Sequence, residues 1–140
     1  MTKNRTNIDK LFLDTEKLLY NYNFIKTQLN NYKVDLEYLK IDYEKYKIPN
    51  CINTNILLDK ENKIKELKNK ININEKQIKK IDNALDLLSE EEKSLVKYRY
   101  FSKLLTPPCW FDISERMGFS EKKCRMMRDN IINKIKTLIF

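Results

Sequence analysis

The chain has one glycine, Gly118, and three prolines among its 140 residues. Sheet proteins need many turns, and turns draw heavily on glycine and proline. Their scarcity, together with 34% charged residues, favours long helices and predicts an all-α fold. A chain with a single glycine is expected to place it where the backbone needs a positive φ, such as a tight turn between two helices.

A seven-residue repeat of mostly apolar side chains runs through the first third of the chain. One column of the repeat consists of Leu11, Leu18, Ile25, Tyr32, Leu39 and Tyr46. A second column, three residues ahead of the first, consists of Ile8, Thr15, Tyr22, Leu29, Leu36 and Tyr43. The repeat predicts one helix from Ile8 to about Tyr46, about 58 Å long, that needs a partner helix to cover its stripe.

The repeat stops near residues 48–55, where Pro49 disfavours helix and several Asn residues favour a loop. It resumes in Leu57, Ile64, Ile71, Ile78 and Leu85. Two helices joined by a short loop predict an antiparallel hairpin over residues 1–88, with parallel pairing between two chains as the alternative. A companion column of the same repeat holds Lys60, Leu67, Asn74, Ile81 and Leu88. Its Asn74 either fixes the register of the pairing or lies exposed at the edge of the seam.

A second unit is predicted over residues 89–140. Ser89 and Glu92 have the spacing of a capping box at the start of a helix that runs to about Phe101. Thr106 and the two prolines after it mark another helix start. Two more helices are expected, from about Cys109 to Met117 and from Glu121 to about Leu138.

The residues around Gly118 have the register of a helix-turn-helix. Ile113 and Met117 share one face of the first helix, and Ser120 can cap the second. The buried face of the second helix is predicted to hold Cys124, Met127, Ile131, Ile135 and Leu138. In this motif the second helix lies in the major groove of DNA. The predicted DNA-binding residues are Ser120, Glu121, Lys122, Lys123, Arg125, Met126, Arg128 and Asp129.

Among these residues Arg125 is the candidate for a base contact, because a guanidinium can bind O6 and N7 of guanine together. Lys122, Lys123 and Arg128 are expected at phosphates. The alternative is an ordinary solvated helix face of mixed charge.

Two aromatic residues, Trp110 and Phe111, open the first helix of the motif. We expect both to pack in the core against Tyr100 and Phe101.

Composition excludes several function classes. There is no histidine, and the three cysteines form no C-x-x-C pair, so we expect no catalytic residue, no metal site and no cofactor. No apolar run approaches the ~18 residues of a membrane span, so we expect a soluble intracellular protein with reduced thiols. A formal charge of +8 favours polyanionic partners.

The last third of the chain resembles region 4 of sigma-70-type factors. The resemblance rests on two runs, Leu88-Ser-Glu-Glu-Glu-Lys-Ser-Leu-Val-Lys-Tyr-Arg-Tyr-Phe101 and Asp112-Ile-Ser-Glu-Arg-Met-Gly-Phe-Ser-Glu-Lys-Lys-Cys-Arg125. Behind a lysine-rich helical stretch, this unit is similar to phage regulators of the RinA/ArpU type, which control late genes. The resemblance implies promoter binding and activation in the cytoplasm of a bacterial host cell, in association with the nucleoid. It places Lys122, Lys123, Arg125 and Arg128 at recognition-helix positions. Glu121 and Met126 depart from the usual basic or polar residues, so the family's promoter readout does not carry over.

The sequence thus predicts a transcription regulator that binds double-stranded DNA as a homodimer or higher oligomer, with RNA polymerase as a further expected partner and no membrane association. One alternative is a DNA-packaging protein of the small-terminase kind, although those usually place the DNA-binding unit first. Another is a coiled-coil adaptor that does not bind DNA. An enzyme is not expected.

Overall fold

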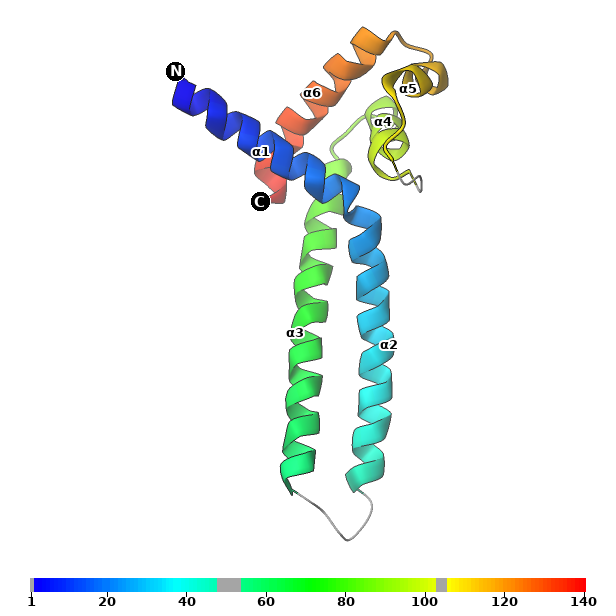
Figure 1. Ribbon diagram of the computed structural model, residues 1–140. Coiled ribbons are helices and arrows are strands. Elements are labelled where there is room, and N and C mark those ends of the chain that lie inside the picture. The colour runs from blue at the N-terminus through cyan, green and yellow to red at the C-terminus, as the bar shows by residue number, and fades with distance from the viewer. Residues whose placement is uncertain (1, 48–53, 103–105) are drawn as a thin grey trace. The chain divides into compact units, whose positions relative to one another are not determined.

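The computed structural model describes residues 2–47, 54–102 and 106–140, and all its elements are α-helices (Figure 1). In chain order they are α1 (Thr2–Tyr20), α2 (Tyr22–Lys47), α3 (Thr54–Leu85), α4 (Glu90–Tyr100), α5 (Trp110–Met117) and α6 (Glu121–Ile139). The all-α prediction is confirmed, with a long helical hairpin and a small C-terminal helical domain. Most of the predicted loop, together with Cys51, lies outside the described residues, and α3 already begins at Thr54.

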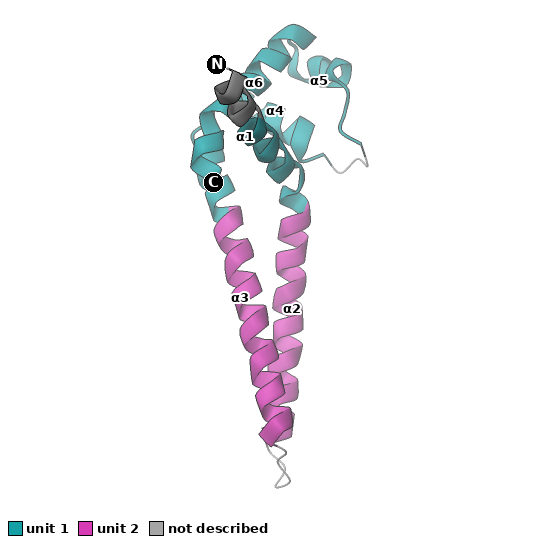
Figure 2. Ribbon diagram, turned by 60° about the vertical axis from the view of Figure 1, so that its left-hand side comes forward, with its two compact units in different colours: residues 1–23, 79–140 teal, residues 24–78 magenta. Residues whose placement is uncertain are grey.

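The helices form two compact units (Figure 2). We call residues 24–78 the hairpin, and residues 1–23 together with 79–140 the head. These limits differ from the boundary between residues 88 and 89 that the sequence suggests. Helix α1 packs on α6 and α4, and it therefore belongs with the C-terminal helices.

The prediction of one continuous N-terminal helix is wrong, because the chain turns at Asn21 between α1 and α2. Asn is a weak helix former, but tertiary contacts also favour the break. The ring of Tyr20 packs edge-on against Tyr100, with 4.7 Å between centroids, and Tyr22 stacks on Phe101 at 4.5 Å. These aromatic contacts within the head redirect the chain, although the heptad spacing continues unchanged through the turn.

The head has a closed core to which α1, α3, α4, α5 and α6 contribute. Its fully buried side chains are Thr15, Leu19, Ile81, Leu95, Val96, Ile113, Cys124, Ile131, Ile132 and Ile135. The hydroxyl of Thr15 donates to the carbonyl of Leu11 at 2.8 Å, so this buried polar group is satisfied.

The predicted buried face of α6 is correct at Cys124, Ile131 and Ile135, and Met127 is half-buried. The prediction is wrong at Leu138, which is exposed. Ile139 is buried in its place. Ile132, Ile135 and Ile139 are spaced by three and four residues, so they lie on one face of α6. Because this face is the buried one near the end of the helix, Leu138 points away from the core.

The hairpin contains most of α2 and most of α3, which run antiparallel within one chain (Figure 1). Leu29, Leu67 and Ile71 form the centre of its seam. Tyr32, Leu36 and Leu39 pack against this centre. The heptad columns of the sequence therefore predict the seam residues correctly in this part of the chain.

Polar contacts fix how the two helices of the hairpin align. The amide of Asn74 donates to Oε1 of Gln28 at 3.2 Å. Nζ of Lys33 lies 3.3 Å from Oε1 of Glu75, and Lys60 pairs with Asp42. Asn74 is half-buried, so its hydrogen bond favours one register over shifted ones.

Candidate nucleic-acid interface

Helix α4 begins at the predicted capping box. The hydroxyl oxygen of Ser89 accepts from the N–H of Glu92 at 3.2 Å, and the carboxylate of Glu92 accepts from the N–H of Ser89 at 3.0 Å. Nζ of Lys134 lies 3.3 Å from the same carboxylate oxygen. Burial opposes the ionised carboxylate, but the backbone N–H of Ser89 and the lysine outweigh it and lower the pKa of Glu92. The start of α4 is thereby tied to α6.

The turn between α5 and α6 also has the predicted geometry. Gly118 has φ 73° and ψ 22°, and its N–H donates to the carbonyl of Ser114 at 2.9 Å. No atom would lie within 4 Å of a Cβ added there, so glycine is needed for its backbone conformation and not for space. Ser120 caps α6 by accepting from the N–H of Lys123 at 3.1 Å.

Helices α4, α5 and α6 pack pairwise around this turn, an arrangement that is compatible with a helix-turn-helix. The first turns of α6 leave most of the predicted DNA-binding residues exposed. The exposed ones are Ser120, Glu121, Lys122, Lys123, Arg125, Met126 and Asp129. Cys124 faces the core, where burial raises the pKa of its thiol. The N-terminal end of a helix also carries a partial positive charge, which suits a phosphate.

The side chain of Arg125 is 55% exposed. One guanidinium nitrogen lies 4.0 Å from Oε1 of Glu121, and the guanidinium carbon lies 5.8 Å from the ring centroid of Trp110. Both contacts are long. Arg125 is therefore held loosely and can turn to an incoming ligand. Lys123 is positioned differently, with Nζ 3.7 Å from the ring centroid of Phe119 in the turn.

Arg128 lies apart from the exposed residues of α6. Its guanidinium is 2.6 Å from Oδ1 of Asp129 and 3.5 Å from Oε2 of Glu16 on α1, and its side chain is only 19% exposed. Burial alone would lower the pKa of Arg128, but the two carboxylates outweigh it and raise the pKa. The expected phosphate contact of Arg128 would have to break these ion pairs, so the exposed surface has one cation fewer than the sequence suggests.

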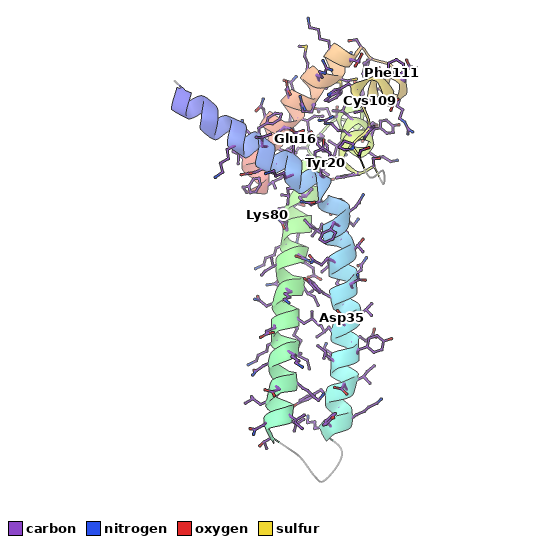
Figure 3. All side chains as sticks on the ribbon, in the orientation of Figure 1. Glu16, Tyr20, Asp35, Lys80, Cys109 and Phe111 are labelled. Carbon is purple, nitrogen blue, oxygen red and sulfur yellow. The ribbon has the colours of Figure 1, made fainter. Side chains whose placement is uncertain are left out.

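Glu16 is the residue that sequence reasoning missed. It lies on α1 (Figure 3), its side chain is 12% exposed, and its carboxylate accepts from the hydroxyl of Tyr100 at 2.6 Å. The same oxygen lies 3.7 Å from Arg99 on α4 and 3.5 Å from Arg128 on α6. Burial, followed by the hydrogen bond to Glu16, raises the pKa of Tyr100. One carboxylate thus joins three helices, and no local sequence pattern signals a contact between residues 112 positions apart.

The two aromatic residues at the start of α5 do not pack as expected. Phe111 is 59% exposed (labelled in Figure 3), so its predicted place in the core is wrong. Trp110 is half-buried against charged groups, with the guanidinium carbons of Arg99 at 4.2 Å and Arg128 at 5.2 Å from its ring centroid. A tryptophan face accommodates guanidinium groups through cation–π attraction. Trp110 therefore packs against Arg99 and Arg128 and helps to hold their side chains in place.

Comparison with family models, with curated proteins and with solved structures finds no match to this chain. Over the described residues, no helix is apolar enough along its length to cross a bilayer. In the same residues, acidic and cysteine side chains nowhere gather in threes that could hold a metal ion.

Proposed function

We propose that this protein is a transcription regulator that binds a specific sequence of double-stranded DNA through α6. The observation that carries the proposal is the exposed first half of α6, which follows the Gly118 turn and is capped by Ser120. This geometry suits insertion of a helix N-terminus into the major groove. The formal charge of +8 favours association with a polyanion.

Within the proposal, Arg125 reads a base and Lys122 and Lys123 bind phosphates. Arg125 is suited to its role because its guanidinium is exposed and only loosely held by Glu121. Met126 is 57% exposed beside it and offers an apolar contact to a thymine methyl group. Arg128 does not contact DNA in this proposal; it holds α6 against α1 through its ion pair with Glu16.

The resemblance of residues 88–125 to sigma-70 region 4 extends the proposal to an activator of phage late genes of the RinA/ArpU type. Such a protein would recruit RNA polymerase to a promoter in the cytoplasm of a bacterial host. We further propose that it acts as a homodimer or higher oligomer whose heads bind repeated or palindromic half-sites.

Selection of bound duplexes from a random DNA pool, at about 150 mM salt, tests the proposal. We expect an enriched motif for the wild-type chain and none for the Lys122→Ala/Arg125→Ala variant. The Lys65→Ala/Lys68→Ala variant removes the same charge from exposed positions of the hairpin and should select the wild-type motif. Absence of an enriched motif with the wild-type chain would contradict sequence-specific binding.

Oligomer mass separates the alternatives that the sequence leaves open. A ring of about eight or more subunits would favour the small-terminase kind of DNA-packaging protein over an activator. If no DNA of any sequence binds, even at low salt, the chain is a coiled-coil adaptor.

A further inference from the structure

Helix α2 has a second apolar stripe, separate from the seam of the hairpin. Val34, Tyr38 and Ile41 are spaced by four and three residues, so they lie on one face of the helix. Their side chains are 49%, 70% and 51% exposed. Leu29 and Leu36, which belong to the seam, lie on the opposite face of α2. The hairpin thus leaves a strip of apolar surface uncovered.

The four acidic residues of α2 flank this stripe. Asp35 and Asp42 are seven residues apart along one edge, and Glu37 and Glu44 are seven apart along the other. Asp42 also pairs with Lys60 of α3, whereas Asp35, Glu37 and Glu44 are exposed.

Lys33 and Lys40 lie between the Glu37 edge and the seam, and Lys45 follows Ile41 by four residues at the end of the stripe. The acidic border therefore flanks the three apolar residues and not the whole length of α2.

The border disfavours pairing of the stripe with its own copy. In an antiparallel pair of α2 helices the Asp35 edge of one copy would face the Asp35 edge of the other. In a parallel pair the Asp35 edge of one copy would face the Glu37 edge of the other. Either arrangement brings carboxylates against carboxylates, which destabilises the pair. Nucleic acid is disfavoured by the same charges, because its phosphates would face carboxylates.

We propose that this face of α2 binds an amphipathic helix of another protein, one whose apolar stripe is bordered by lysine or arginine. The partner's apolar side chains would cover Val34, Tyr38 and Ile41, while its cations would meet the acidic edges. This contact involves only the hairpin. It is separate from DNA binding by the head, and each can fail without the other.

Two synthetic peptides of about 21 residues, or three heptads, serve as probes of the full-length protein. They share leucines at the central positions and differ only at the flanking positions, which are lysine in one and glutamate in the other. Titration followed by fluorescence anisotropy should show the lysine peptide binding at least about tenfold more tightly than the glutamate peptide.

Two variants of the protein separate this proposal from non-specific attraction. Tyr38→Ser/Ile41→Ser removes the stripe at exposed positions and should abolish binding, whereas Asn69→Ser/Asn72→Ser at exposed positions of α3 should leave it unchanged. Glu37→Lys/Glu44→Lys should shift the preference toward the glutamate peptide.

Three results would overturn the proposal. The first is that the two peptides bind equally or not at all. The second is that Tyr38→Ser/Ile41→Ser lowers the mass of the protein's own oligomer in sedimentation, because a second copy would then cover the stripe. The third is that this variant weakens binding to DNA, which would place nucleic acid on the stripe.

Discussion

The head and the hairpin are both helical, but they are stabilised in different ways. The head has fully buried side chains on five helices, and the carboxylate of Glu16, whose side chain is 12% exposed, joins three of those helices. In the hairpin the most buried seam residues, Leu29, Leu67 and Ile71, remain 8% to 9% exposed, since only one face of each helix is covered. In the closed core each buried side chain packs against several helices. In the seam each side chain packs mainly against the facing helix and its neighbours in the next turns.

This difference predicts unequal responses to the loss of one core side chain. Ile131→Ala in the head should lower the free energy of unfolding by about 4 kcal/mol, because the side chains that surround this fully buried position cannot move in to fill the cavity. Leu67→Ala in the hairpin should cost about 2 kcal/mol, near the lower limit for such changes. Urea unfolding followed by circular dichroism measures both values. Equal losses would contradict the contrast between core and seam.

The cluster around Glu16 is expected to stabilise the head by the next largest amount. Glu16→Gln removes the negative charge near Arg99 and Arg128 and should cost about 2 kcal/mol, since two partly buried guanidinium groups lose a counter-ion. The control Glu115→Gln changes an exposed residue of α5 and should cost under about 0.5 kcal/mol. If both variants unfold at the same urea concentration, Glu16 does not hold the head together.

The Gly118 turn offers a smaller and purely conformational test. Gly118→Ala should cost about 1 to 2 kcal/mol, because an L-residue is strained at φ 73° even where its Cβ meets no atom. Gly118→Asn should cost less, because Asn tolerates this conformation better. Thermal unfolding can rank the three chains, and a ranking with Ala above Asn would show that the turn has another geometry.

The smallest expected effect depends on pH. The folded head lowers the pKa of Glu92 from its ordinary value of 4.5, so the ionised carboxylate stabilises the fold above that value and this contribution is lost as pH falls through the folded pKa. Glu92→Gln should therefore cost about 1 kcal/mol at neutral pH. At about pH 3 the cost should be smaller. A cost that stays constant between these two pH values would exclude ionisation as its source.

Sequence reasoning predicts the parts of the molecule that local chemistry determines. The Ser89 cap, the Gly118 turn and the Ser120 cap each depend on residues within three or four positions, and the structure confirms all three. The seam of the hairpin follows from a repeat, which is also a local pattern.

Long-range contacts explain the failures. The chain turns at Asn21 because Tyr100 at the end of α4 and Phe101 after it pack against the flanking tyrosines, and the heptad spacing does not predict these contacts. Likewise, α1 places Glu16 beside Arg128, so an arginine expected to face a phosphate is paired inside the head. Periodicity shows which face of a helix is apolar, but it does not identify the helix that covers that face.

The most direct test of the proposed function is equilibrium binding of Arg125 variants to a selected duplex and to duplexes with single base-pair changes. Arg125→Ala should lose about 1 to 3 kcal/mol of binding free energy and should tolerate changes at one base pair that the wild-type chain rejects. Arg125→Lys keeps the charge but loses the bidentate contact. It should therefore bind the selected duplex more tightly than Arg125→Ala does, but without the wild-type preference for one base pair. Unchanged affinity and unchanged base preference in Arg125→Ala would contradict DNA reading by α6.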